Sequence, residues 1–233
     1  MTQPTPPKVI GLDLSLTCTG VAGNGWTDTI KPPTKLRGHE RLQWIEDRIG
    51  DFAYRADLIA VEGPAYGTQR AGIQRGHHER AGLWWITTQR LWVNKIPFAV
   101  VDPTSVKRYA TGKGNADKAA IMLAVARRFP WFDGGEDEAD ALILAAMAAD
   151  HLGHPLADMP ATHRKALDAV QWPDLLRAAG YGEPQRDPNA CDTPGHPARP
   201  SGWCPICHGE PDEKTAALAA LGRGTDDTRK DAA

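Results

Sequence analysis

The chain of 233 residues has few cysteines, almost no net charge and no long apolar run. Its four cysteines, three of them within residues 191–207, do not resemble the disulfide framework of a small secreted domain. The longest apolar run, residues 139–149, is interrupted by Asp140 and is far too short to span a bilayer. The opening segment, MTQPTPPK, lacks the apolar stretch of a secretory leader. We therefore expect a cytoplasmic protein with no membrane partner.

The composition is that of a globular protein with an uneven distribution of charge. Hydrophobic residues make up 41% of the chain and charged residues 24%. The net charge of −2 argues against a generally basic nucleic-acid-binding protein, yet residues 70–128 carry +8 and the remainder −10. A local cationic surface near carboxylates suits a metal-dependent enzyme that acts on a polyanion. The alternative is a solvated helix face with unpaired arginine and lysine side chains.

Apolar periodicity predicts an α/β fold, a mixed central sheet flanked by helices. The stretch ADLIAVEGP, for example, is a short apolar run that ends in Gly-Pro, which is typical of a buried strand. The helix after residue 114 is expected to be capped by Asn115. We expect strands over residues 8–14, 19–22, 27–32, 56–64 and 96–103, and helices over 36–54, 70–94, 104–112, 115–129, 134–150 and 160–180.

Four acids within five residues, EDEAD at 136–140, directly precede an apolar helix. Capping of the helix start explains one or two of them. Asp137 and Asp140 are three residues apart, so they share a helix face that continues through Leu144 and Met147, the face that should be buried. Carboxylates directed at a core need a partner, and a divalent metal ion would provide one.

Two further acids occupy strand ends, where soluble chains rarely place them. Asp13 lies in VIGLDLSL and Glu62 ends LIAVEG. Ligand sites of α/β proteins lie outside the carboxyl ends of strands, so the two acids could join Asp137 and Asp140 around two Mg²⁺ or Mn²⁺ ions. Two such ions support in-line phosphoryl displacement by water. A buried, ion-paired structural acid is the alternative for either residue alone.

The segments IGLDLSLTCTG, IAVEGP, VDPTSVKRYATGKGNADK and DEADALILA occur in this order, and over about residues 8–152 the chain resembles the RuvC-type Holliday junction resolvases of the ribonuclease-H-like superfamily. The resemblance implies a homodimer that nicks two opposing strands of a four-way DNA junction symmetrically. It also implies that Asp13, Glu62, Asp137 and Asp140 are the metal ligands, with Asp13 bridging both ions.

Basic and aromatic residues near these motifs are candidates for DNA contact. Lys107 and Lys118 fall in the stretch most similar to the family's Thr-Gly-x-Gly-x-Ala-x-Lys pattern and could contact the scissile or a neighbouring phosphate; either could also be a solvated lysine. Tyr66 could stack on a base near the junction centre or pack within the protein. The remaining candidates for the DNA path are Arg70, Arg75, His77, His78 and Arg80.

A Cys/His cluster follows in a proline-rich and glycine-rich segment. Cys204 and Cys207 form a C-x-x-C pair, which together with Cys191 and a histidine would close a structural zinc site. His196 or His208 would be the fourth ligand, and free surface cysteines are the alternative. The cluster departs from the usual bacterial resolvase. Cys18, in contrast, is expected to pack as a small residue between strands.

These features predict a ribonuclease-H-like nuclease domain (1–155), a helical extension (156–185), a zinc-binding loop (186–212) and a tail (213–233), within a bacterial cell or a phage-infected host. An actin-like kinase or ATPase also opens with an Asp-bearing strand, but the chain is too short for the second large domain of that class. A non-catalytic junction-binding protein would tolerate loss of the acids, and all four are present. A nuclease for flaps or other branched DNA shares the same chemistry and stays open.

Overall fold

A five-stranded mixed sheet lies at the centre of the structure, a computed structural model that describes residues 6–64 and 77–174. Its strands are β1 (Val9–Asp13), β2 (Thr19–Gly23), β3 (Trp26–Ile30), β4 (Leu58–Glu62) and β5 (Phe98–Val101). They lie in the order β3-β2-β1-β4-β5, with β3, β2 and β1 paired antiparallel and β1, β4 and β5 paired parallel. The predicted mixed sheet is confirmed.

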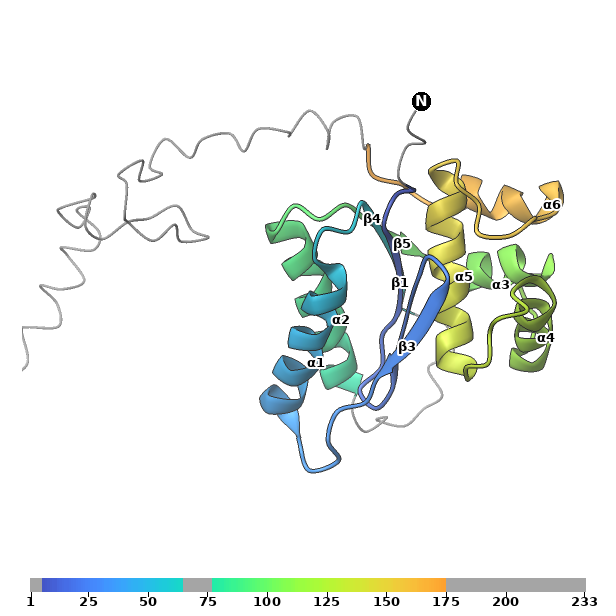
Figure 1. The fold of residues 1–233 in the computed structure, drawn as a ribbon. Coiled ribbons are helices and arrows are strands. Elements are labelled where there is room, and N and C mark those ends of the chain that lie inside the picture. Colours follow the sequence, from blue (N-terminus) through green and yellow to red (C-terminus); the bar gives the residue numbers. More distant parts are fainter. Residues whose placement is uncertain (1–5, 65–76, 175–233) are drawn as a thin grey trace, which may run out of the picture. The chain divides into compact units, whose positions relative to one another are not determined.

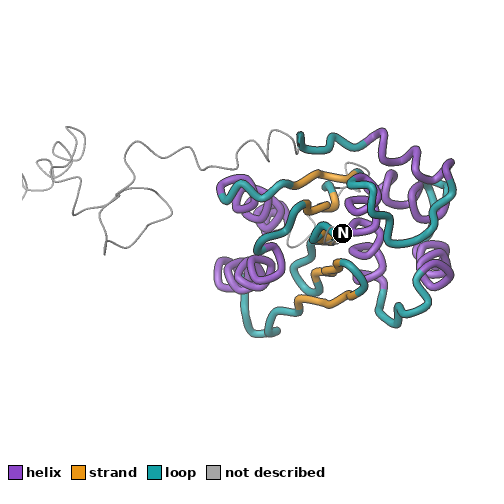
Figure 2. The backbone as a smooth tube through the Cα atoms, turned by 45° about the horizontal axis from the view of Figure 1, so that its top comes forward, coloured by secondary structure: helices purple, strands orange, loops and turns teal. Residues whose placement is uncertain are grey.

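Helices cover both faces of this sheet (Figures 1 and 2). They are α1 (Gly38–Ala53), α2 (His77–Val93), α3 (Pro103–Thr111), α4 (Lys118–Arg128), α5 (Glu136–His151) and the short α6 (Ala161–Arg164), which continues as a 3₁₀ turn, Lys165–Ala169. Alternate strand residues point to opposite faces, so Ile10 and Ile59 pack with α1 and α2, whereas Val9 and Leu58 pack with α3, α4 and α5.

Helix α5 lies directly against β1 and β2. Its residues from Ala141 to Ala149 are all buried, because the helix is covered by the sheet on one side and by α3 and α4 on the other. Glycines in the strands allow this close approach. A Cβ atom at Gly11 would lie 2.0 Å from the Ala141 carbonyl oxygen, and one at Gly20 would lie 1.9 Å from the Asp137 carbonyl oxygen. The start of α5 is thereby held against the middle of the sheet.

Two local predictions were wrong. Helix α4 begins later than expected, and its cap is Asp117, whose side chain accepts from the Ala120 amide at 2.8 Å, instead of Asn115. In place of a helix over 160–180, the described part of that stretch contains only α6 and the 3₁₀ turn. This stretch is nevertheless well packed, since Met159, Ala166 and Val170 join the core on the α5 side of the sheet.

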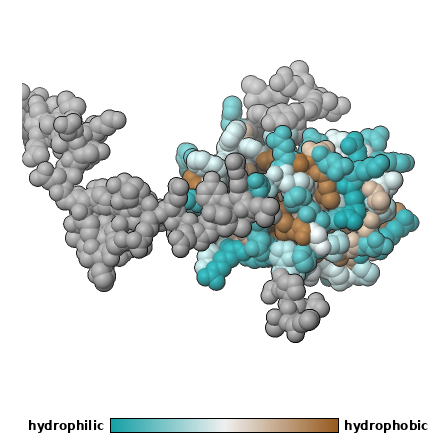
Figure 3. All heavy atoms as spheres, turned by 90° about the horizontal axis from the view of Figure 1, so that it is seen from above, coloured by the Kyte–Doolittle hydropathy of each residue, from teal (hydrophilic) through white to brown (hydrophobic). Residues whose placement is uncertain are grey.

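Several predicted residues lie outside the described residues: Tyr66, Arg70, Arg75, Cys191, His196, Cys204, Cys207 and His208. The zinc-binding loop and the tail lie there as well. No helix within 6–64 or 77–174 has the length and apolar character needed to cross a membrane. Figure 3 views the described part from above, where hydrophilic residues surround a smaller apolar area.

Candidate active site

Two of the predicted acids end neighbouring parallel strands. Asp13 is the last residue of β1 and Glu62 the last residue of β4, and the register pairs Leu12 with Val61, the residues just before them. Parallel neighbours in this register bring both carboxyl groups to the same edge of the sheet. They are close enough for each to shift the pKa of the other.

The other two predicted acids arrive from the first turn of α5. Asp13 pairs with Gly20 of β2, and the backbone of Asp137 lies directly over that glycine. Asp137 and Asp140 therefore reach the sheet edge beside Asp13, and both are half-buried. Glu138 has a different task, since its side chain accepts from the Gly135 amide at 2.8 Å and caps the helix. The capping role expected for part of the EDEAD stretch therefore belongs to Glu138.

Burial and mutual repulsion make three of these acids hard to ionise. Burial raises the pKa of Glu62 to about 8, and Asp13 and Asp140 add to the effect. Burial also raises the pKa of Asp140 to about 6, with Asp13 contributing, and it raises the pKa of Asp13. At neutral pH without a cation, Glu62 retains its proton, and this protonated neighbour favours the ionised form of Asp13. The cluster is thus short of positive charge.

Four hard oxygen donors around a deficit of positive charge fit a divalent cation such as Mg²⁺. The side chains are neighbours without a preformed coordination shell: among the described residues, no three His, Cys, Asp or Glu side chains are close enough together to hold one ion. The donor chemistry therefore fits the metal, and small side-chain movements would be needed to bind it.

The two predicted lysines lie near the carboxylates, Lys107 on α3 and Lys118 at the start of α4. The Lys118 ammonium lies 2.8 Å from a Glu136 carboxylate oxygen in an exposed ion pair, and this hydrogen bond raises its pKa. Lys118 also lowers the pKa of Asp13, and Lys107 of α3 lowers the pKa of Glu62, so both cations face the cluster. Arg80 is exposed on α2, whose Trp84 indole donates to the Glu62 carbonyl oxygen at 3.1 Å.

The sequence interpretation missed two residues near the site, Cys18 and Lys31. Cys18 is a free, half-buried thiol in the turn before β2, where we had expected a residue packed between strands. Burial and a hydrogen bond to Asp137 raise its pKa to about 11, while Lys31 lowers it. The register of the antiparallel strands accounts for both positions. Cys18 lies two residues before Gly20, which pairs with Asp13. Lys31 follows Ile30, which pairs with Thr19.

Proteins similar in sequence to this chain include bacterial endonucleases. No family model matches it. The crossover junction endodeoxyribonuclease RuvC of Cutibacterium acnes is 29% identical over 188 residues, which cover 73% of this chain and 93% of the relative. RuvC of Nocardia farcinica is 27% identical over 176 residues, which cover 70% and 90%.

Solved structures give the same result at the level of the fold. Thermus thermophilus RuvC matches with a TM-score of 0.50 and 20% identity over 66% of this chain and 99% of that chain, and the same protein in complex with a Holliday junction substrate matches equally well. The chain is similar in sequence to the RuvC-type resolvases and has their ribonuclease-H-like fold.

Proposed function

We propose that this protein is a metal-dependent endonuclease that resolves four-way DNA junctions. The observation that carries the proposal is the convergence of Asp13, Glu62, Asp137 and Asp140 at one sheet edge, from three separate elements. Relatives named crossover junction endodeoxyribonuclease supply the substrate class.

The four carboxylates would hold one or two divalent ions, with Asp13 between Glu62 and the two α5 acids. Bound Mg²⁺ or Mn²⁺ would supply Lewis-acid activation of water and of the phosphodiester. The chain's own residues orient this chemistry: the Trp84 indole fixes the end of β4 through the Glu62 carbonyl, and Gly20 admits the α5 backbone. Lys107 and Lys118 would bind the phosphate next to the carboxylates.

We also propose a homodimer that forms through the outer face of α2. Trp85 is 67% exposed, Trp92 is 72% exposed and Val93 is 60% exposed, and their spacing along the helix forms one stripe. Large aromatic side chains are enriched at protein interfaces, and a stripe of this kind is unfavourable in water. A second copy would bring a second carboxylate cluster to the opposing DNA strand, which symmetric nicking requires.

A test compares Asp13→Asn with wild type on a mobile four-way junction, a flap and a linear duplex, in Mg²⁺ and in EDTA. We expect wild type to cut the junction in Mg²⁺ alone, and Asp13→Asn to lose on the order of 100-fold or more of the rate while junction binding persists. The matched control is Asp133→Asn, which removes an exposed acid near the start of α5. It should cut like wild type.

Two outcomes would contradict parts of this proposal. Equal cutting of flaps and junctions would retain the metal site and assign the chain to a broader class of branched-DNA endonucleases. Junction binding with no metal-dependent cutting of any substrate would leave a non-catalytic binding protein.

For residues 186–212 we propose one structural Zn²⁺ held by Cys191, Cys204, Cys207 and either His196 or His208. The C-x-x-C spacing supports this, because it presents two thiolates to one tetrahedral ion. Elemental analysis of purified protein should find about one zinc per chain. Cys204→Ser with Cys207→Ser should remove it, and zinc-free wild-type protein would contradict the site.

A further inference from the structure

The loop between β3 and α1, residues 31–37, lies at the carboxylate end of the sheet, on the β3 side. Ile30, the last residue of β3, pairs with Thr19, and the next residue of β2 pairs with Asp13. Figure 1 shows the loop at the same end of the molecule as the start of α5. Two strand spacings, about 10 Å, separate β3 from β1, and Lys31 is close enough to lower the pKa of the Cys18 thiol.

The loop is stiff before any ligand binds. It opens with Pro32 and Pro33, whose ring geometry restricts the backbone. A turn follows in which the Leu36 amide donates to the Pro33 carbonyl oxygen at 3.0 Å. The Arg37 guanidinium closes the loop by donating to the Leu36 carbonyl oxygen at 2.7 Å and to the Thr34 carbonyl oxygen. A preformed loop loses little conformational entropy on binding.

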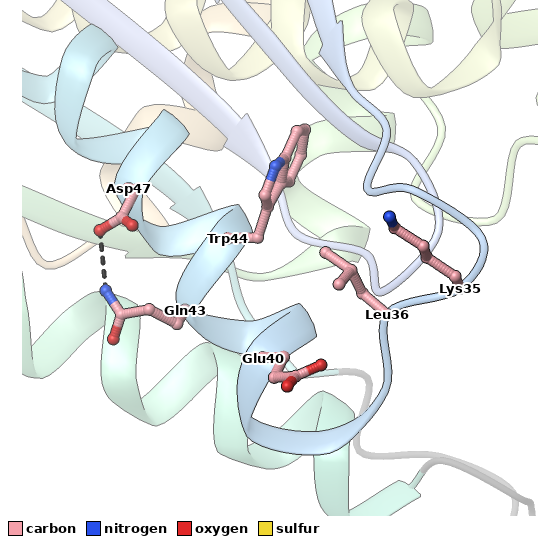
Figure 4. A pocket seen from close by; sticks show the side chains of 6 residues that line it. All are labelled: Lys35, Leu36, Glu40, Gln43, Trp44 and Asp47. Carbon is pink, nitrogen blue, oxygen red and sulfur yellow. Dashed lines mark hydrogen bonds between the residues drawn. The ribbon is translucent and has the colours of Figure 1, made fainter.

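The loop also lies beside α1. A shallow hollow of about 560 Å³ lies between them, lined by Lys35, Leu36, Glu40, Gln43, Trp44 and Asp47. Figure 4 shows Lys35 and Leu36 extending from the loop toward the part of α1 that carries Trp44. The Gln43 amide donates to the Asp47 carboxylate at 2.7 Å, so one of the acids that line the hollow already has a hydrogen-bond partner on α1.

The cations of the loop are exposed and lack acidic partners. Lys31, Lys35 and Arg37 are all exposed. Within residues 6–64 and 77–174, none of the ion pairs involves any of the three. Two exposed lysines on a restrained loop near the carboxylate end of the sheet are suited to a polyanion.

We propose that Lys31 and Lys35 bind backbone phosphates of the cut DNA strand on the β3 side of the carboxylates. The strand would cross the site from Lys107 and Lys118 to this loop. About 10 Å is about three base-pair rises, so the loop would contact phosphates a few nucleotides from the cut. Arg37 is a positioning residue, because its guanidinium donates to the loop's own carbonyl groups.

The inference rests on the proposed function and is tested with the full chain. Lys31→Ala with Lys35→Ala, in the inactive Asp13→Asn background, should bind a four-way junction about tenfold more weakly. The slope of log affinity against log salt should become shallower by about 1.8, since each phosphate contact contributes about 0.9. With Asp13 restored, the rate at saturating DNA should stay near that of wild type.

The charge-matched control is Arg127→Ala with Lys165→Ala, which removes two exposed cations from α4 and from the 3₁₀ turn. Its affinity and salt slope should stay near those of wild type. Unchanged junction affinity in the loop variant, with altered pH or Mg²⁺ dependence of cutting, would overturn the inference, because the lysines would then serve the carboxylates alone. If wild type fails to cut any junction, the proposed function fails instead.

Discussion

The carboxyl group of Glu62 holds a proton at neutral pH unless a cation replaces it. Its pKa is raised to about 8 first by burial and then by Asp13, which lies beside it at the sheet edge. Asp140, with a pKa raised to about 6, behaves in the same way at lower pH. A divalent ion at the proposed site would bind only after these protons leave, so metal binding should release protons.

This linkage predicts opposite pH responses for the metal-free and the metal-loaded protein. The folded state retains protons that the unfolded chain releases near the ordinary carboxyl pKa of 4.5, so the stability of the metal-free protein should fall as the pH rises from about 5 to about 8. Thermal unfolding in EDTA measures this. Excess Mg²⁺ should raise the melting temperature more at about pH 8 than at about pH 6.

Glu62→Gln is the control that tests whether Glu62 causes this dependence of stability on pH. The variant lacks the titrating group, so the fall in stability between about pH 6 and about pH 8 should largely disappear. A wild-type protein whose metal-free stability rises over this range would contradict the assigned protonation of Glu62.

At the scale of elements, the site depends on how closely α5 approaches the sheet. Gly20→Ala would place a Cβ atom 1.9 Å from the Asp137 carbonyl oxygen, which is backbone and cannot turn aside. We expect the free energy of unfolding to fall by about 3 kcal/mol. Cutting should also be lost in the protein that remains folded, because Asp137 moves with the helix. Urea unfolding and single-turnover cutting measure the two effects.

Gly50→Ala is the matched control for that substitution. Gly50 lies inside α1, and a Cβ atom there would meet only the Arg90 side chain, at 3.5 Å. The change should stabilise the protein by about 0.5 to 1 kcal/mol through helix propensity. Equal stability of the two variants would contradict the close packing of α5 on β2.

The opposite end of α5 is held by a buried acid that the sequence interpretation did not single out. The Asp150 carboxylate accepts from the Tyr109 hydroxyl at 3.0 Å and from the Arg164 guanidinium at 2.5 Å, which ties α3 and α6 to the helix. Burial and this carboxylate raise the pKa of Tyr109. Asp150→Ala should cost about 2 kcal/mol of stability. The maximal cutting rate of the folded protein should be unchanged, because Asp150 is far along α5 from the carboxylates.

At the scale of the whole molecule, the exposed stripe of α2 determines the expected assembly. Trp85→Glu with Trp92→Glu should convert a dimer to a monomer, as measured by light scattering after size exclusion. Paired nicking should be lost. Trp131→Glu is the control, because Trp131 is 44% exposed but lies beyond α4, beside Phe129 and Phe132. A wild type that is already monomeric at the concentration of the cutting assay would contradict the dimer.

The sequence predicted the sheet and its helices because apolar periodicity records which residues are buried. Asp13 and Glu62 could be identified because acids at the ends of apolar strands are unusual. The start of α4 was missed because Asn115 and Asp117 are both good caps by residue type, and the structure uses Asp117. Cys18 and the loop after Ile30 were missed because their proximity to the site depends on the register of β2 and β3, which spans distant parts of the chain.

Mapping the nicks on a mobile four-way junction tests the proposed function most directly. Each of the four strands carries a label in turn, and the products are resolved on a denaturing gel in Mg²⁺. We predict nicks at symmetric positions in two opposing strands, present with wild type and absent with Asp13→Asn. Absence of Mg²⁺-dependent nicks, or equal nicking of a linear duplex, would contradict a junction-resolving nuclease centred on Asp13, Glu62, Asp137 and Asp140.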